Sequence, residues 1–506
     1  MASARSGESG LDRALNAYAQ AFQRWLPTPF SIAILLTVVA AVSALPLSSP
    51  HEVLNSWVDG LWNPGLMRFG FQAMFMLVLG HVLALAPPVL RMLSKAVDWL
   101  VLRPAWAPAK VAMLSMALGW LNWGLGLIGG AILVRGVLDT MRRTPESSNL
   151  HHIHAGVLGA AGYTGLLVWH GGISGSAPLK AAESGHLQSL VPQAAWASEL
   201  PEAMSLRETA LSNWSLMVTL AVGLAVIAVF AWLGQRTFDA SSRASTDDRG
   251  ETNTGSDGSE NPESWRSGAS ESWGTAVPEP EEGSANGMVT SSVHGFADRL
   301  DTQRGLAYLL GLACMGGALM WAARNETWTQ LTFVTPDWIN LVLLGFAMVA
   351  HGQVRGMLAA LDQAIAGASG ILVQFPLYFG IMGMVTGTGL GELLAQTLVN
   401  LTSPSMLPEA LFVSSGLLNI FVPSGGGQWA VQGPLVLEAC HALGVPLERG
   451  IMAMAFGDEL TNMLQPFWAL PLLGITGLSA RDILPYTLLI MIVAGCVMLA
   501  LMAFWA

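Results

Sequence analysis

Long runs of apolar residues dominate the chain and show no polar face. A stretch such as Val218–Phe230 lacks the polar positions that a surface helix of a soluble protein would repeat every three or four residues. Uninterrupted apolar runs occupy Phe30–Leu45, Leu66–Ala86, Ser212–Leu233, Gly305–Ala322, Trp338–Ala350, Ile371–Val385 and Ile483–Ala506. A helix needs about 20 such residues to cross a bilayer, so the pattern predicts an all-α polytopic membrane protein with about 9–11 membrane segments.

Four further apolar stretches are interrupted by glycine, proline and polar residues. The interruptions are Asn122–Gly130, Gly171–Pro178, Asn419–Gln428 and Gly457–Pro466. Non-helical backbone at membrane depth is tolerated only where protein buries it or where it lines a water-filled cavity. Two of these runs, about 111–137 and about 410–438, are long for one span and short for two. Each is therefore expected to form a re-entrant helical hairpin.

The two halves of the chain repeat the same order of span, broken run, broken span and span. Lys110, Arg135 and Arg142 flank the first hairpin, whereas Glu409 and Glu438 flank the second. The positive-inside rule then places the hairpins on opposite faces of the membrane. This predicts two inverted repeats, with a substrate site where the broken segments meet.

The expected domains follow from this order and from one strongly polar segment. They are a cytoplasmic N-terminal segment at 1–29, a first membrane repeat at 30–235, an acidic disordered connector at 236–303, a linking span at 304–336 and a second membrane repeat at 337–506. The connector has 13 acidic and 5 basic residues, so it carries −8 of the formal net charge of −11. The rest of the chain has no basic surface for nucleic acid.

Glycine-rich breaks suit the binding of a small anion. A helix that restarts after a break presents free N–H groups and the positive end of its dipole, and none of the four breaks contains Lys or Arg. Close helix packing is the alternative explanation of these glycines. The predicted substrate-binding residues are Asn122, Gly124, Gly126, Ser174, Gly175, Ser176, Asn419, Ser424, Gly425, Gly426, Gly427, Gln428, Asn462 and Gln465. Aromatic residues beside the breaks could pack against an acyl chain or simply between helices: Trp123, Phe421, Trp429, Phe467 and Trp468.

Two acidic residues, Asp458 and Glu459, fall in the fourth broken segment. A charge at mid-bilayer costs roughly 3 kcal/mol or more and usually marks a functional path. Either carboxylate could carry a coupling proton, or the pair could join backbone carbonyls around Na⁺; a helix end facing water is the alternative. His81 and His170 are expected to be mainly structural, with a lesser role in proton movement, and Lys180 is expected to reach an interface. No metal site or cofactor is predicted.

Several of these motifs resemble the short-chain fatty acid transporter family, the permeases for acetoacetate, butyrate and similar acids. The matching stretches are Arg24–Pro27, Asn122–Gly130, Gly171–Leu179, Gly370–Pro376, Val422–Trp429, Gln432–Pro434 and Asn462–Pro471. The resemblance covers nearly the whole chain except 236–303. It implies a secondary active transporter of short-chain carboxylates in the cytoplasmic (inner) membrane of a prokaryote, working by symport with H⁺ or Na⁺. It also implies that Asp458, more than Glu459, is the functional carboxylate.

Three other functions remain open at this stage. A dicarboxylate permease of the same architecture would need a second set of hydrogen-bond donors. A sugar-acid permease would need more polar side chains than the breaks contain. A membrane-embedded enzyme is not expected, because Ser174 and His170 have no evident third partner. A passive channel would differ in failing to concentrate its substrate. Beyond substrate, ion and lipid, a homodimer is compatible with the sequence.

Overall fold

The computed structural model describes residues 29–145, 148–251, 301–324, 333–421 and 425–504. Over these residues the chain forms helices and no strand, which confirms the all-α prediction. The α-helices of the first half are α2 (Pro29–Ala44), α3 (Pro50–Leu61), α4 (Pro64–Ala84), α5 (Pro87–Val101), α6 (Ala107–Leu121), α7 (Trp123–Arg143), α8 (Ala155–Tyr163), α9 (Ser176–Ala181), α10 (His186–Leu190) and α11 (Asn213–Glu251). Those of the second half are α13 (Arg304–Arg324), α14 (Pro336–His351), α15 (Val354–Gly387), α16 (Leu390–Leu401), α17 (Leu407–Phe421), α18 (Gly425–Leu443), α19 (Leu447–Thr461), α20 (Pro466–Thr476) and α21 (Ala480–Ala503).

The outer helices turn large apolar side chains outward, as a lipid environment requires. On α13 the small residues Ala307, Gly311 and Ala318 are buried, whereas Leu309 and Leu319 are 69% and 70% exposed. In water this arrangement would place the largest hydrophobic side chains in the solvent. Between lipid and protein it is favourable, because small residues let the helix backbones of α13 and α14 approach each other closely.

Several described helices are long and apolar enough to cross a membrane. They are Pro64–Ala84, Trp123–Arg143, Asn213–Asp239, Arg304–Arg324 and Ala480–Ala503. Shorter apolar helices occupy Ala33–Ala44, Ala155–Leu167, Pro336–His351 and Leu372–Gly387. The predicted polytopic architecture is therefore confirmed.

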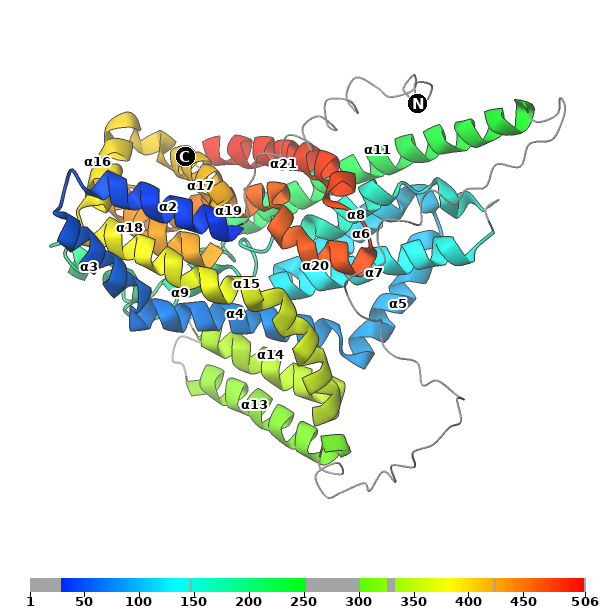
Figure 1. The fold of residues 1–506 in the computed structure, drawn as a ribbon, viewed down its shortest axis with the longest axis horizontal. Helices are drawn as coiled ribbons and strands as arrows, with labels where there is room; N and C mark the ends of the chain where they lie inside the picture. The colour runs from blue at the N-terminus through cyan, green and yellow to red at the C-terminus, as the bar shows by residue number, and fades with distance from the viewer. Residues whose placement is uncertain (1–28, 146–147, 252–300, 325–332, 422–424, 505–506) are drawn as a thin grey trace.

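The order of elements is the same in the two halves. Each contains a helical hairpin (α6–α7 and α17–α18), then a broken helix (α8–α9 and α19–α20), then a long apolar helix (α11 and α21). In Figure 1 the two hairpins lie toward opposite ends of the long axis of the molecule. Hairpins that enter from opposite faces would be arranged in this way, but the inverted orientation of the halves stays a prediction.

The long helix α11 extends beyond the boundary predicted for it. It continues to Glu251 and projects from the body of the molecule, so residues 236–251 of the expected disordered connector are helical (Figure 1). Its extension is held by packing, because Phe238 meets the ring of His152 at 5.4 Å and Ser241 hydrogen-bonds to His152 Nδ1 at 3.0 Å. Most of the remaining connector, 252–300, lies outside the described residues.

One close crossing between two helices depends on two glycines. Helices α3 and α15 touch at Gly60 and Gly383, where a Cβ on Gly383 would clash with the Ser56 carbonyl and lie 2.7 Å from Gly60 Cα. A side chain there would have to move backbone rather than another side chain. The contact therefore admits glycine alone.

We expect Gly383→Val to lower the stability of the folded protein by about 1–3 kcal/mol, because the added atoms overpack this crossing. Gly223→Val on α11 is the matched control, since nothing lies within 4 Å of a Cβ at that position. The thermal unfolding midpoint of detergent-purified protein measures both. Equal midpoints for the two variants would contradict the packing role.

Candidate substrate-binding site

The first hairpin and the first broken helix form one unit. The chain leaves helical geometry after α8 and the short 3₁₀ helix η3 (Thr164–Leu167), and it becomes helical again at Ser176. In this gap Ile173 N donates to Trp120 O at 2.9 Å, and Ser174 Oγ accepts from Trp123 N at 3.0 Å. The hairpin tip thus supplies hydrogen-bond partners to the broken segment.

The first hairpin tip is much shorter than the predicted break over 122–130. Only Asn122 leaves helical geometry, with φ −158°, and its side chain caps α7 by accepting from Leu125 N at 2.9 Å. The glycines that follow are helical and serve packing. A Cβ on Gly126 would clash with Gly119, and one on Gly130 would clash with the carbonyl of Gly162. Close helix packing, not unwinding, explains these positions.

The second half contains a matching unit held by an asparagine. Asn419, near the end of α17, donates through Nδ2 to Thr461 Oγ1 at 3.1 Å, to Asn462 Oδ1 at 3.0 Å and to the carbonyl of Asp458. Gln465 returns a hydrogen bond from its Nε2 to the Asn419 carbonyl. The second hairpin therefore holds the broken helix α19–α20 as the first holds α8–α9.

The fourth break is also shorter than the predicted range 457–466. Helix α19 continues to Thr461, so Asp458 and Glu459 lie in its last turn, and the break covers a 3₁₀ turn and Gln465. Helix α20 then begins at Pro466, which fits the first position of a helix because that N–H has no intrahelical partner. Gly457 belongs to helix packing, since a Cβ there would clash with the Phe412 carbonyl on α17.

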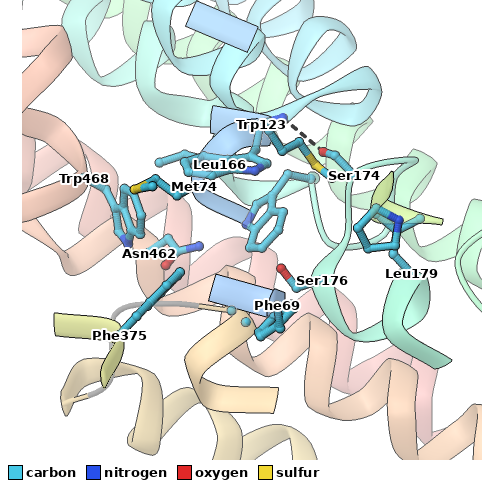
Figure 2. Close-up of a pocket in the computed structure, with 15 residues that line it drawn as sticks. Phe69, Met74, Trp123, Leu166, Ser174, Ser176, Leu179, Phe375, Asn462 and Trp468 are labelled. Atoms are coloured by element: carbon cyan, nitrogen blue, oxygen red, sulfur yellow. Dashed lines mark hydrogen bonds between the residues drawn. The ribbon is translucent and has the colours of Figure 1, made fainter. Parts of the chain in front are cut away.

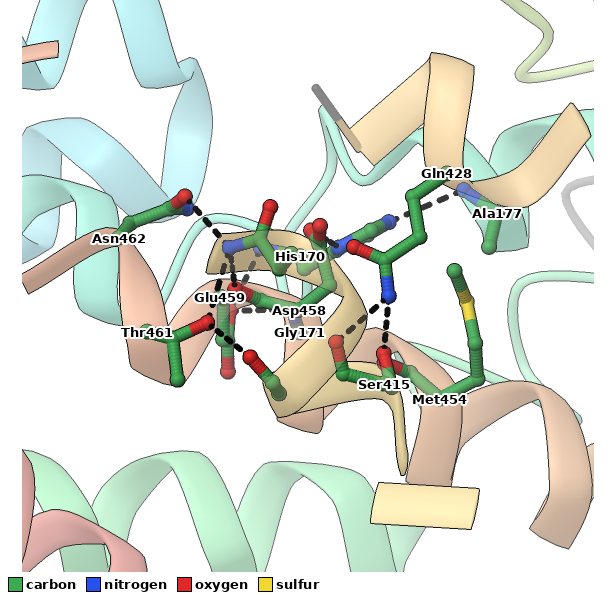
Figure 3. A network of polar contacts seen from close by, with 12 residues as sticks. His170, Gly171, Ala177, Ser415, Gln428, Met454, Asp458, Glu459, Thr461 and Asn462 are labelled. Atoms are coloured by element: carbon green, nitrogen blue, oxygen red, sulfur yellow. Dashed lines mark hydrogen bonds and ion pairs between the residues drawn. The ribbon is translucent and has the colours of Figure 1, made fainter. Parts of the chain in front are cut away.

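The two units meet at a buried polar junction, which Figure 3 shows. His170 Nδ1 lies 2.7 Å from Asp458 Oδ2, and Ala177 N donates to His170 Nε2 at 3.1 Å. Glu459 Oε2 accepts from the backbone N–H groups of His170, at 2.8 Å, and Gly171, at 3.3 Å. The side chains of His170, Asp458 and Glu459 are 0–1% exposed. Neither carboxylate faces water, so that alternative is wrong for this conformation.

A small cavity of about 40 Å³ lies beside this junction (Figure 2). Aromatic and aliphatic side chains make most of its wall, and polar groups come from two serines, one asparagine and the start of α18. The lining residues are Phe69, Met74, Met76, Trp123, Leu166, Trp169, Ser174, Ser176, Leu179, Pro336, Phe375, Gly425, Gly426, Asn462 and Trp468. It has room for roughly three water-sized groups.

Some of the predicted binding residues line this cavity and others do not. Those in its wall are Ser174, Ser176, Gly425, Gly426 and Asn462. Those outside its wall are Asn122, Gly124, Gly126, Gly175, Asn419, Gly427, Gln428 and Gln465. Gln428 illustrates the difference, because its Nε2 turns into the hairpin and donates to Ser415 O at 2.9 Å. Ser424 lies outside the described residues.

The aromatic residues beside the breaks divide in the same way. Trp123 and Trp468 both line the cavity and meet edge to face, with ring centroids 5.3 Å apart. Trp429 instead donates from Nε1 to His186 Nε2 at 3.0 Å. The side chains of Phe421 and Phe467 lie outside the described residues.

Sequence patterns missed much of the apolar wall. Phe69, Met74 and Met76 come from the continuous helix α4, and Phe375 comes from α15. No break or unusual spacing marks Phe69, Met74 and Met76, whereas Phe375 lies in the matching stretch Gly370–Pro376 and could have been selected from it. Trp169 is different: it lies two residues before the second break and could have been grouped with the other aromatic residues.

Lys180 does not reach an interface. It is 3% exposed, and its Nζ donates to Gln72 Oε1 and Glu183 Oε2, both at 2.8 Å. Gln72 continues the network by donating to Asp337 Oδ1 at 2.7 Å, and Arg68 pairs with the same carboxylate. The sequence neighbours of Arg68, Lys180 and Asp337 line the cavity: Phe69, Leu179 and Pro336. This charged network therefore backs one wall of the cavity.

Comparison with known proteins gives consistent matches along the chain. A family described as short chain fatty acid transporter matches residues 11–242 and 279–505. A protein of Escherichia coli K12, described as a candidate short-chain fatty acid transporter, is 32% identical over 486 residues, which cover 94% of this chain and 95% of that protein. A protein of Haemophilus influenzae with the same description is 31% identical over 466 residues, covering 92% and 93%.

Two solved transporter structures share the fold. The YdaH transporter of Alcanivorax borkumensis, known for an unusual topology, superposes with a TM-score of 0.53 at 13% identity, covering 95% of this chain and 98% of that one. MtrF of Neisseria gonorrhoeae, from a class of antimetabolite efflux pumps, gives a TM-score of 0.53 at 11% identity, covering 97% of each chain. At this identity the likeness concerns the fold alone.

Two buried tyrosines should respond differently to the loss of their hydroxyl groups, because only one of them is hydrogen-bonded at the fourth break. Tyr163 Oη lies 2.9 Å from the carbonyl oxygen of Asn462 and 3.0 Å from that of Gln465, whereas Tyr378 Oη is buried without a hydrogen-bond partner among the described residues. Tyr163→Phe should cost about 1–3 kcal/mol, because it leaves buried carbonyls unsatisfied, and Tyr378→Phe should be neutral or stabilising. Thermal unfolding of both variants measures this. A fall of similar size in both would contradict the assignment.

Proposed function

Because this chain belongs to the short-chain fatty acid transporter family, we propose that it carries short monocarboxylates such as acetoacetate and butyrate across the cytoplasmic membrane by alternating access. The observation that supports this most is the cavity at the meeting point of the hairpins and broken helices. It combines a mainly aromatic and aliphatic wall with a few polar groups, and it is small. A monocarboxylate has the same division into one charged end and one apolar end.

The carboxylate end of the substrate would lie at the start of α18. Gly425 and Gly426 line the cavity there, and their backbone N–H groups belong to the first turn of α18, where an N–H has no partner within the helix. These N–H groups and the helix dipole together favour an anion. Ser176 adds a hydroxyl and Asn462 an amide at the same wall. No Lys or Arg is among the residues found to line the cavity, so the anion would be held by dipoles.

The acyl end of the substrate would pack against the aromatic wall. Trp123, Trp169, Trp468 and Phe375 surround the apolar part of the cavity. A second carboxylate would meet a wall whose polar groups are single indole N–H donors, which replace only part of its water, and this is costly. These features favour a monocarboxylate over a dicarboxylate or a sugar acid.

Asp458 is the best candidate for the group that carries the coupling charge. It is fully buried at the junction of the two halves, and its Oδ1 has no hydrogen-bond partner among the described residues. It also adjoins the substrate end of α18, since a Cβ on Gly425 would lie 3.0 Å from Asp458 Oδ2. Its ionisable partner among the described residues is an imidazole, which itself binds and releases protons. We therefore favour H⁺ over Na⁺ as the coupling ion.

Purified protein in lipid vesicles should accumulate labelled acetoacetate or butyrate when a pH gradient is imposed. Unlabelled short monocarboxylates should compete and dicarboxylates should not, because few polar groups line the cavity. Empty vesicles under the same gradient correct for diffusion of the uncharged acid through lipid. Uptake equal to that of empty vesicles across a panel of short acids would refute the function, and competition by dicarboxylates would point to the alternative permease.

A second prediction concerns the cavity wall at Gly426. A Cβ at this position would clash with the Phe69 ring, so Gly426→Ala should force the ring into the cavity. Such overpacking costs about 1–3 kcal/mol, and uptake should fall roughly 5- to 150-fold.

Matched variants separate this effect from general damage to the protein. Gly474→Ala on α20 should leave uptake unchanged, because nothing lies within 4 Å of a Cβ there. Phe69→Leu combined with Gly426→Ala should recover part of the uptake, measured against Phe69→Leu alone. Normal uptake by the single Gly426→Ala variant would show that the tip glycine does not shape the binding site.

A further inference from the structure

The hydrogen bonds around His170 fix its protonation and its tautomer. A backbone N–H can only donate, so Ala177 N requires His170 Nε2 to be an acceptor without a proton. The imidazole is then neutral, with its hydrogen on Nδ1, and this hydrogen points at Asp458 Oδ2 2.7 Å away. In this conformation the Asp458 carboxyl accepts, and the pair has room for one more proton.

The acceptor Nε2 also serves as the cap of a short helix. Ala177 lies in the first turn of α9, where N–H groups have no partner within the helix, and the N-cap residue Gly175 has no side chain to supply one. His170 Nε2 takes that place from outside the helix. Helix α9 in turn carries Ser176 and Leu179, both in the cavity wall. One imidazole thus connects the buried carboxylate to the wall of the binding site.

Of the two ring nitrogens of His170, Nε2 is the one that can gain a proton in this hydrogen-bond network. Asp458 occupies Nδ1, and Glu459, from the same turn of α19, is held by the backbone N–H groups of His170 and Gly171. Lys180 on α9 is paired with Glu183 and Gln72 instead. The ring of Trp169, itself in the cavity wall, stacks on the imidazole with centroids 4.3 Å apart.

We propose that His170 couples proton binding to the shape of the substrate cavity, by exchanging the Ala177 hydrogen bond for a proton on Nε2. This inference rests on the proposed function and deepens it. A proton taken up at Nε2 turns that atom into a donor facing a second donor, Ala177 N–H. The start of α9 must then move away and find another acceptor, and Ser176 and Leu179 move with it.

The proton balance is the same for either final position of the charge. The pair binds one proton from the aqueous phase at Nε2. The Nδ1 hydrogen either stays, which leaves an imidazolium beside a carboxylate, or passes to Asp458, which leaves a neutral ring protonated on Nε2. Both forms lack the acceptor that Ala177 uses. Release of the proton on the other side of the membrane restores the bond to α9.

The test compares two transport modes of the same reconstituted protein. Driven uptake is the accumulation of labelled acetoacetate under a pH gradient. Exchange is the swap of internal labelled acid for external unlabelled acid at equal pH, which needs movement of the loaded carrier but no net proton transfer. A residue with only a structural role would affect both modes together.

His170→Gln is the decisive variant, because a glutamine amide can accept from Ala177 N–H but cannot bind a proton at neutral pH. His170→Asn is the companion, with an amide placed to donate to Asp458. Both should keep exchange within about threefold of wild type and lose driven uptake. His186→Gln is the matched control, since His186 Nε2 also accepts an N–H, from Trp429, and not from a group at the Asp458 junction; it should keep both modes.

Each other outcome overturns a defined part of this scheme. Driven uptake that survives in His170→Gln would exclude His170 as the coupling residue. Loss of exchange and driven uptake together in both monodisperse variants would assign it a structural role. Wild-type uptake that follows a Na⁺ gradient and ignores pH would refute proton coupling at His170 but leave the transport function intact. Wild-type vesicles that neither exchange nor accumulate any short acid would instead refute the transport function.

Discussion

Every backbone N–H and C=O that leaves helical geometry inside a membrane must find a partner within the protein, and this constraint organises the whole site. The first broken segment obtains its partner from a hairpin tip, through Ile173 and Trp120. The second obtains its partners from the side chain of Asn419. Tyr163 then joins the halves by contacting the carbonyls of Asn462 and Gln465. Hairpins and broken helices are therefore mutually dependent.

The same hydrogen-bond demand explains why the cavity has so few polar groups. Polar side chains near the breaks, such as Asn419 and Gln428, are used to hold the hairpins and breaks together. The polar groups at the cavity are the start of α18, Ser176, and two residues that also bind the hairpin tips, Ser174 and Asn462, set among aromatic rings. A site of this composition suits one small anionic group on an apolar body. The substrate class proposed for the protein is thus a consequence of how the breaks are stabilised.

The His170–Asp458 junction lies on one side of the cavity, and the charged network of Arg68, Asp337, Gln72, Lys180 and Glu183 lies behind another. On one side His170 links α9 to Asp458 without contact with water. Behind Phe69, Leu179 and Pro336, a network from Arg68 to Lys180 joins α4, α9 and α14. Helix α9 belongs to both sides, since His170 caps its first turn and Lys180 lies in its last. Movement of this short helix would reach both ends of the cavity at once.

The sequence by itself determined the class of protein and the family, because apolar length and glycine–proline interruption are local properties. It located the breaks at Asn122, before Ser176 and before Pro466 but made the first and the fourth too long, and the centre of the third, 422–424, lies outside the described residues. It also selected Ser174, Ser176, Gly425, Gly426 and Asn462, which lie at those breaks. Only the tertiary structure decided that the glycines after Asn122 pack helices, and that α4 and α15 complete the cavity wall. Those outcomes depend on which helix faces reach each other across the molecule, and such contacts leave no periodic signal along the chain.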